Sequence, residues 1–572
     1  MAAAPRSAGT AVMRWAVPVT LALLWAGVGS ASADVSAAAL SRDAAVNAFV
    51  AQWADDEGPG FAWAAMHDGA VVTRGARGLA SVEHVLPLTP DSRFNAASIA
   101  KPFTAWAVLD LVEGGGLALD DTVESLLPGR FGFDDAVTVE RLLQHTGGLQ
   151  DYWALSALAG IHPGDLITQQ HALAQIARVA GTPAFTPGSR HGYSNSGYIV
   201  LAELVRERSG SPLAERLATR LFEPLGMQAS VVIDSPRGVV PGLAEAYETR
   251  RDVVLRTPLQ SGVHGSGNLV TTVYDLLRWS RWLLDADGGA EWLERLRGQP
   301  HFDALPAPGY GRGVQVGRHG DAEAVWHSGA NAGYRGYWLL LPETGTAVAV
   351  LANHADVPVE RVARGLADLV LADGAVAVDP GDDDGPRVAV PAGPDEAEAA
   401  RYEGLYLLET GVLFSVRWLR GGLHLMMSGT PVALEPVAEH RFTVAGDDAE
   451  LAFELDTRGE VNVARLHLPE ATLRADPQTP ARKRRRALRD YAGEWYSDAL
   501  GVAWTLAPDD DGRLVIERRR AADFRVRPLR ENLFVEWETG DLRLRFERDF
   551  RGRARTMYVS VDRARDIEFT RR

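Results

Sequence analysis

An internal repeat in the last third of this 572-residue chain sets the first limit on its fold. The sequence Tyr-Glu-Gly-Leu-Tyr at 402–406 is matched by Tyr-Ala-Gly-Glu-Trp at 491–495, an offset of 89 residues. Each copy continues with short runs of alternating apolar and polar residues, such as 451–455 and 542–546. Such alternation, broken by frequent turn residues, is typical of antiparallel meanders or small closed barrels. We therefore expect two barrel-like accessory domains, since neither copy contains a convincing catalytic group.

The remaining chain is long enough for a further domain, because a single core rarely grows beyond about 250–300 residues. An acidic stretch with Gly and Pro at 379–386 predicts a flexible linker before the first barrel. The predicted organisation is a signal peptide (1–33), a first globular domain (34–375), a linker (376–398), a barrel-like domain (399–476), a linker (477–486) and a second barrel-like domain (487–572).

Strand patterns lie at both ends of the first domain, and helical patterns lie between them. A hairpin is predicted over 61–74, and further strands are predicted at 311–316, 336–341 and 346–351. The apolar spacing of 100–113 predicts a largely buried helix. This order predicts an α+β domain with one sheet built from both ends of the domain and a helical insertion.

The N-terminus has the parts of an export signal. Arg6 and Arg14 precede an apolar stretch at 15–28, and Ala31-Ser32-Ala33 fits the small-x-small pattern of a cleavage site. The apolar stretch is shorter than the about 20 residues of a typical membrane span. We expect cleavage after Ala33, export to the periplasm or the medium, and no stable membrane insertion afterwards. An uncleaved anchor is the alternative.

Composition excludes several classes of protein. The chain has no cysteine, so disulfides, a thiol nucleophile and thiolate metal sites are excluded. No His-Glu-x-x-His sequence is present, and we predict neither a metal nor a cofactor. The formal net charge of −16 disfavours a nucleic-acid partner, because phosphate backbones bind basic surfaces. The basic run at 482–486 is interpreted as a solvated linker.

Lysine is nearly absent, and one of the two lysines lies in a suggestive place. Lysine and arginine together number 59, yet Lys101 and Lys483 are the only lysines. A buried lysine can lose its proton and act as a base, whereas arginine cannot. Lys101 follows Ser98 by three residues at the start of the predicted helix, a spacing that places the amine within reach of the hydroxyl. The pair Ser98/Lys101 is therefore a candidate for nucleophilic chemistry.

Two other segments of the first domain carry candidate groups. Tyr193 and Asn195 lie two residues apart in a loop between glycines, where both can point into one cleft; a capped turn with a buried tyrosine is the alternative. Gly192-x-Ser194-x-Ser196 lacks the last glycine of a nucleophile elbow, and we reject that interpretation. His327 is followed by Gly329, which leaves room for a substrate against the backbone, although a lone histidine is often structural.

With these three motifs in this order, the chain resembles the serine β-lactamase and penicillin-binding acyltransferase superfamily. Ser-x-x-Lys, Tyr-x-Asn and Lys/His-x-Gly recur in that group. The resemblance extends through much of 40–370 and includes the scaffold-like segments 142–149 and 267–272. It implies a β-lactamase/transpeptidase-like α+β fold, with an antiparallel sheet flanked by helices and a helical region, followed here by the two barrels.

The resemblance implies catalytic roles for three residues. Ser98 is the expected nucleophile that becomes acylated. Lys101 is expected either to take the serine proton or to be the cation that keeps Tyr193 poised, and the two possibilities stay open. Tyr193 is expected to carry the proton to the leaving group.

The resemblance also implies substrate-binding groups. Asn195 is expected to orient the substrate and Lys101, while His327 steers the substrate electrostatically and Gly329 borders it. The backbone N–H groups of Ser98 and Ala330 are expected to form the oxyanion hole.

The third motif begins with His327 where many members have lysine, which weakens a carboxylate anchor and disfavours β-lactamase activity. Histidine there and the two added barrels resemble D-aminopeptidases. We therefore expect an exported serine hydrolase that releases N-terminal D-amino acids from small peptides or amides. A D,D-carboxypeptidase, an esterase and a weak β-lactamase are alternatives with the same chemistry. A catalytically silent protein that binds cell-wall peptides is the non-enzyme alternative, and the oligomeric state stays open.

Overall fold

The computed structural model describes residues 42–572 with several short gaps. The residues left out inside this range are 163, 236, 303–308, 373–392, 411, 420, 428–429, 445–448, 469–470, 480 and 482–484. The predicted signal peptide and most of the predicted 376–398 linker therefore lie outside the described residues.

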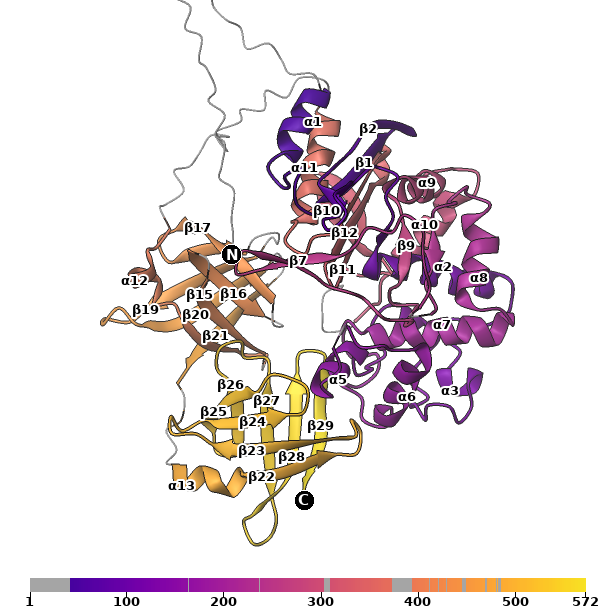
Figure 1. Cartoon of the computed structure of the whole chain (residues 1–572). Helices are drawn as coiled ribbons and strands as arrows, with labels where there is room; N and C mark the ends of the chain where they lie inside the picture. Colours follow the sequence, from indigo (N-terminus) through magenta and orange to yellow (C-terminus); the bar gives the residue numbers. More distant parts are fainter. Residues whose placement is uncertain are drawn as a thin grey trace, which may run out of the picture. The chain divides into compact units, whose positions relative to one another are not determined.

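The first domain is built on a six-stranded antiparallel sheet, with strand order β10-β11-β12-β13-β1-β2 (Figure 1). Its strands are β1 (Phe61–His67), β2 (Ala70–Arg77), β10 (Gln315–His319), β11 (Ala322–Asn331), β12 (Tyr334–Leu341) and β13 (Thr346–Ala352). β1 pairs along its whole length with β13, so strands from both ends of the domain share one sheet. The predicted α+β arrangement is confirmed.

Helices cover both faces of this sheet (Figure 1). The covering helices are α1 (Arg42–Val50) and α11 (Val359–Leu371) on one face and α2 (Ala100–Glu113) and α9 (Val273–Leu283) on the other. Because successive strand residues point to opposite faces, Trp63 enters the core beside α11 and Ala64 enters the core beside α2. The bounds of α2 are those that its apolar spacing predicts.

The helical region and the small sheets lie between β2 and β10 in the sequence. Its helices are α3 (Val123–Leu126), α4 (Val139–Leu143), α5 (Tyr152–Leu158), α6 (Gln169–Val179), α7 (Asn195–Ser209), α8 (Leu213–Leu217) and α10 (Gly289–Arg297). The short strands are β3 (Leu79–Ser81), β4 (Leu86–Pro87), β5 (Phe94–Asn95), β6 (Val231–Val232), β7 (Tyr247–Arg250), β8 (Val253–Arg256) and β9 (Leu269–Thr271). No helix among the described residues is long and apolar enough to cross a membrane.

Strand β10 begins later than the sequence predicts. Residues 311–316 carry a strand pattern, but pairing with β11 begins at Gln315. Gly313 has a φ of +82°, and a Cβ there would lie 2.8 Å from the carbonyl oxygen of Lys101. This positive φ and the close approach to α2 turn the chain before it can enter the sheet. The turn brings Tyr310 to the site described below.

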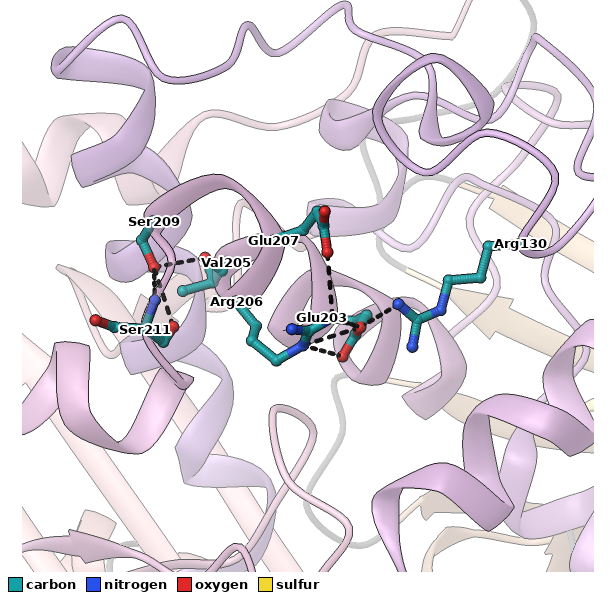
Figure 2. Close-up of polar contacts among 7 residues, drawn as sticks. All are labelled: Arg130, Glu203, Val205, Arg206, Glu207, Ser209 and Ser211. Atoms are coloured by element: carbon teal, nitrogen blue, oxygen red, sulfur yellow. Dashed lines mark hydrogen bonds and ion pairs between the residues drawn. The ribbon is translucent and has the colours of Figure 1, made fainter.

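An ion-pair cluster holds the second half of α7 (Figure 2). The Glu203 carboxylate, whose side chain is 6% exposed, pairs with the guanidinium groups of Arg130 and Arg206. The distance from Arg206 Nη2 to Glu203 Oε1 is 2.6 Å. Gly210, with φ +73°, then ends the helix. A buried carboxylate held by two cations fixes α7, whose first residue is Asn195.

Each copy of the repeat forms a closed eight-stranded antiparallel barrel, as the alternating pattern predicts (Figure 1). The first comprises β14 (Gly404–Leu408), β15 (Leu413–Leu419), β16 (Gly422–Met427), β17 (Thr430–Ala438), β18 (Arg441–Val444), β19 (Glu450–Leu455), β20 (Val461–Leu468) and β21 (Ala471–Gln478), after α12 (Glu396–Ala399). The second comprises β22 (Gly493–Ser497), β23 (Val502–Pro508), β24 (Leu514–Arg518), β25 (Phe524–Arg530), β26 (Leu533–Glu536), β27 (Arg543–Arg548), β28 (Ala554–Val561) and β29 (Ala564–Arg571), after α13 (Arg485–Leu488).

The repeated motif marks the same structural feature in both barrels. Tyr402 and Tyr491 are 2% and 1% exposed, respectively, and each packs on phenylalanines inside its barrel. The Tyr406 hydroxyl donates to the carbonyl oxygen of Tyr402 at 2.7 Å, and Trp495 Nε1 donates to that of Tyr491 at 3.0 Å. The motif therefore repeats because an aromatic side chain four residues on satisfies a buried carbonyl group in each copy.

Candidate active site

Ser98 lies in a turn that joins a buried strand to helix α2. The turn (Ala97–Ile99) is a 3-10 helix directly after β5, so Ser98 precedes α2 itself. Ala97 has a φ of +49°, a conformation that costs a non-glycine residue about 1–3 kcal/mol. The side chain of Asn95 accepts the Ala97 N–H at 2.9 Å and donates to Asn268 at 3.1 Å. These bonds hold the strained turn and fix the position of Ser98.

The amine of Lys101 is fully buried next to Ser98. Nζ lies 3.0 Å from Ser98 Oγ, 2.9 Å from Asn195 Oδ1 and 2.8 Å from the carbonyl oxygen of Ser266. Burial lowers the pKa of Lys101 well below its ordinary value. Two of its three partners are carbonyl oxygens, which only accept hydrogen bonds. Nζ therefore donates to these two carbonyl oxygens and makes its third hydrogen bond with the Ser98 hydroxyl, the group that a lysine base would deprotonate.

The hydroxyl of Tyr193 also contacts Ser98. Burial raises the pKa of Tyr193, although its hydrogen bond to Ser98 lowers it. The Lys101 Nζ lies 4.8 Å from the centre of the Tyr193 ring, and the ring of His145 packs on it with centroids 4.2 Å apart. Tyr193 is therefore a protonated phenol at neutral pH. Lys101 is the member of this group whose pKa is shifted toward that of a base.

A buried carboxylate fixes the position of Asn195. Asp151, 1% exposed, accepts hydrogen bonds from the Asn195 backbone N–H at 2.7 Å and from Nδ2 at 3.0 Å. The other carboxylate oxygen caps α5 by accepting the N–H groups of Trp153 and Ala154. Because Nδ2 faces Asp151, Oδ1 must face Lys101. Asp151 thereby sets the orientation of the Asn195 amide.

His327 is buried and uncharged at neutral pH. Its pKa is lowered to about 3, first by burial and then by the nearby Lys101, although a backbone hydrogen bond to Ser328 raises it. Nδ1 lies 2.6 Å from the Ser328 carbonyl oxygen, so Nδ1 carries the proton and Nε2 accepts from the Tyr310 hydroxyl at 3.0 Å. An imidazole with this pKa carries no charge at neutral pH, so His327 meets a substrate as a neutral polar group, and its role in steering the substrate stays a prediction.

Gly329 lies where β11 passes closest to the Ser98 turn. A Cβ on Gly329 would lie 2.2 Å from the carbonyl oxygen of Ala96, so no other residue fits. β10 pairs with β11 only as far as Trp326, which leaves 327–331 of β11 free of that strand. Ala330 and Ser98 line the same cavity along this segment. The backbone beside Ser98 is thus open to a substrate.

Most of these groups line one cavity, which has a volume of 640 Å³. Five of the seven predicted site residues line it, and the other two, Lys101 and Gly329, are buried. The full lining is Ser98, Trp153, His191, Tyr193, Asn195, Gly309, Tyr310, Gln315, His327, Ser328, Ala330, Asn331, Ala332 and Arg563. No cluster of three His, Cys, Asp or Glu that could hold a metal occurs in the described part of the chain.

Sequence reasoning missed several of these lining residues, and Arg563 is the most distant. It lies in the turn between β28 and β29 of the second barrel, and its Cζ is 5.1 Å from the centre of the Tyr193 ring. Its carbonyl oxygen accepts the N–H of Asp151 at 2.9 Å. The second barrel, predicted to be accessory, therefore supplies a side chain to the cavity. Arg563 lies in no sequence motif that could have drawn attention to it.

The Beta-lactamase family model matches residues 45–373, more than half of the chain. The chain belongs to the Beta-lactamase family. Within this family it is similar to a D-aminopeptidase of Gluconobacter oxydans, 29% identical over 54% of this chain and 58% of that one. It is 31% identical to a D-aminopeptidase of Brucella anthropi over 49% of this chain and 53% of that one. The chain thus spans about half the length of these curated relatives.

A solved structure resembles this Beta-lactamase family member over a larger part of its length. It is the octameric penicillin-binding protein homologue from Pyrococcus abyssi, with a TM-score of 0.55 and 25% sequence identity. The match covers 75% of this chain and 99% of that chain. The predicted β-lactamase/transpeptidase-like fold is confirmed.

Proposed function

We propose that this protein is a serine hydrolase that forms an acyl-enzyme at Ser98 and cleaves amide bonds in small peptides or amides of D-amino acids. The observation that carries the proposal is the buried amine of Lys101, which lies 3.0 Å from Ser98 Oγ while two carbonyl oxygens accept its other hydrogen bonds. A fully buried lysine of this kind is poised as a base.

Acylation begins when Lys101 takes the proton of Ser98 as Oγ bonds to the substrate carbonyl carbon. The carbonyl oxygen gains negative charge, and the N–H groups of Ser98 and Ala330 stabilise it by about 3–4 kcal/mol each. The C–N bond then breaks while the Tyr193 hydroxyl gives its proton to the leaving nitrogen. The protonated Lys101 returns a proton to the Tyr193 phenolate, so both groups end in their starting states.

Deacylation uses the same groups in the reverse order. A water molecule bonds to the acyl carbon and gives one proton to the neutral amine of Lys101, which then returns this proton toward Ser98 Oγ. The C–O bond to Ser98 breaks, and Oγ takes the proton back. The acid is released, and the free enzyme is restored.

Preference for D-amino acids is the finer part of the proposal. It is supported by the names of the two D-aminopeptidases at 29% and 31% identity, which share the catalytic part of the chain. A D,D-carboxypeptidase, an esterase or a β-lactamase would use the same acyl-enzyme chemistry. A silent binding protein would not need a buried base beside the serine.

A substrate panel tests this proposal with the wild type and Ser98→Ala. The panel contains D- and L-alanine 4-nitroanilide, D-alanyl-D-alanine, an acetate ester and a chromogenic cephalosporin. We expect turnover of the D-amides above that of the L-amide, and none of these reactions in Ser98→Ala. Turnover of the cephalosporin alone would show that the D-amide specificity is wrong.

We further propose that the protein is exported and cleaved after Ala33, on the strength of the N-terminal sequence. Expression of the full chain in a bacterial host, followed by mass measurement of the exported protein, tests this. A mature N-terminus at Asp34 is the expected result. Retention of residues 1–33 on a membrane-bound protein would favour the uncleaved anchor instead.

A further inference from the structure

The charge of the catalytic cavity points to a substrate that carries a carboxylate. Of the residues that line it within the described structure, none is Asp or Glu, and Arg563 is the permanently charged one. His327 is uncharged, and the Asp151 carboxylate is buried on Asn195 and α5. A substrate with a free ammonium group would find no carboxylate on this lining, while a substrate carboxylate would find a guanidinium.

The backbone around Arg563 fixes its place in the site. Its carbonyl oxygen accepts the N–H of Asp151 at 2.9 Å. Two residues on, Arg565 donates its N–H to Gln150 Oε1 at 2.8 Å and accepts from Gln150 Nε2 at 2.8 Å. Gln150 is 2% exposed, so these bonds are shielded from water. The turn is therefore anchored to Gln150 and Asp151, and Asp151 also orients the Asn195 amide.

The guanidinium of Arg563 has N–H donors available to bind a ligand. Its ion pair in the described structure is with Asp562, through Nε at 3.4 Å, and the side chain is 45% exposed. A pair between neighbouring, half-exposed side chains stabilises little. A guanidinium has a planar array of five N–H donors, which matches the two oxygens of a carboxylate.

A second cavity extends the cationic surface. It has a volume of 390 Å³ and shares His191, Tyr193 and Arg563 with the catalytic cavity. Four arginines and two aspartates line it. Burial raises the pKa of one of them, Asp541, to about 6, which weakens its negative charge at mildly acidic pH. In a chain of net charge −16, this is a local concentration of positive charge next to the nucleophile.

We propose that Arg563, supplied by the second barrel, binds a carboxylate on the leaving group, so that the enzyme prefers substrates whose released fragment is an α-amino acid. The proposal rests on the acyl-enzyme function given above and names its substrate class. The guanidinium lies 5.1 Å from the ring of Tyr193, whose hydroxyl gives its proton to the leaving nitrogen. In an α-amino acid the carboxylate is one carbon away from that nitrogen, which places it near Arg563.

Two substrates with the same scissile bond test this inference. They are D-alanyl-D-alanine and its C-terminal carboxamide, which differ only in the negative charge of the released residue. We expect the wild type to favour the carboxylate by about tenfold in kcat/KM, the low end of a charge-assisted hydrogen bond because Arg563 is half exposed. In Arg563→Gln the ratio of the two kcat/KM values should fall to about one, through a higher KM for the carboxylate substrate.

Two further variants make the result specific. Arg563→Lys should keep part of the preference, because it retains the charge and loses the planar array of donors. Arg551→Gln, on an exposed turn of the same barrel, should leave the preference unchanged and is the matched control. A wild type that cleaves both substrates equally, or an Arg563→Gln variant that keeps the preference, would overturn the inference while the acyl-enzyme proposal stands. Cleavage of neither substrate would overturn the inference, and activity in Ser98→Ala or no turnover of any amide in the panel would overturn both proposals.

Discussion

Replacement of Lys101 by arginine separates proton transfer from positive charge at one position. The wild-type amine is 0% exposed and has three partners within 3.0 Å. Arginine keeps a cation there and cannot lose its proton, so it cannot accept the proton of Ser98. Loss of a general base costs about 10²–10⁴ in rate, and base and nucleophile act as one unit here. We therefore expect kcat/KM to fall by at least about 10³-fold, or about 4 kcal/mol in transition-state stabilisation.

The assay is hydrolysis of D-alanine 4-nitroanilide by wild type, Lys101→Arg and Lys101→Met. The methionine side chain is of similar length and carries no charge. If Lys101→Met loses as much activity as Lys101→Arg, the loss does not come from the larger guanidinium disturbing the cavity. Thermal unfolding of all three checks that the fold is retained. A Lys101→Arg enzyme within about tenfold of wild type would refute the role of Lys101 as proton acceptor.

The pH dependence of the wild type gives the same reasoning a second test. The active form of Lys101 is the neutral amine, and burial lowers its pKa well below the ordinary value. Activity should therefore be present above this lowered pKa and lost as pH falls through it. An acid limb that persists unchanged in the residual activity of Lys101→Met would mean that another group titrates.

Two further substitutions and one spectroscopic measurement test contacts in the site. Gly329→Ala should lower kcat/KM by about 100-fold, because its Cβ would lie 2.2 Å from the carbonyl oxygen of Ala96, next to the turn that contains Ser98. Gly181→Ala, where the added Cβ would enter open space, should match wild type. Asp151→Asn should reduce kcat by about 10- to 100-fold in a folded protein, since it puts a second amide against that of Asn195; wild-type kcat would contradict this. Nitrogen NMR of the imidazole should show His327 neutral, with the proton on Nδ1, at pH 6; an imidazolium signal there would contradict the lowered pKa.

Local sequence patterns predict the elements that depend on local physics. The spacing of apolar residues gives the bounds of α2 because one side of that helix packs on the sheet and the rest on other helices. The repeat of Tyr402 at Tyr491 reflects one buried hydrogen bond made twice. The strand pattern of 311–316 fails because a close approach to α2, 200 residues away in sequence, decides the conformation of Gly313.

The site was predictable only in part for the same reason. Ser98, Lys101, Tyr193 and Asn195 lie in short motifs whose spacing reports their chemistry. The contribution of Arg563 depends on how a barrel turn meets a loop 415 residues earlier, as the bonds between Arg565 and Gln150 show. No local pattern encodes such a contact. The charge of a histidine is equally hidden, because burial by residues distant in sequence sets its pKa.

Mass spectrometry of a covalently labelled enzyme tests the central claim most directly. The mature protein is treated with a fluorophosphonate, digested and analysed for the peptide that contains Ser98. One phosphonyl group on Ser98, absent in Ser98→Ala and much slower to form in Lys101→Arg, is the predicted result. No label at Ser98 under conditions that label a control serine hydrolase, or equal labelling of wild type and Lys101→Arg, would contradict the account.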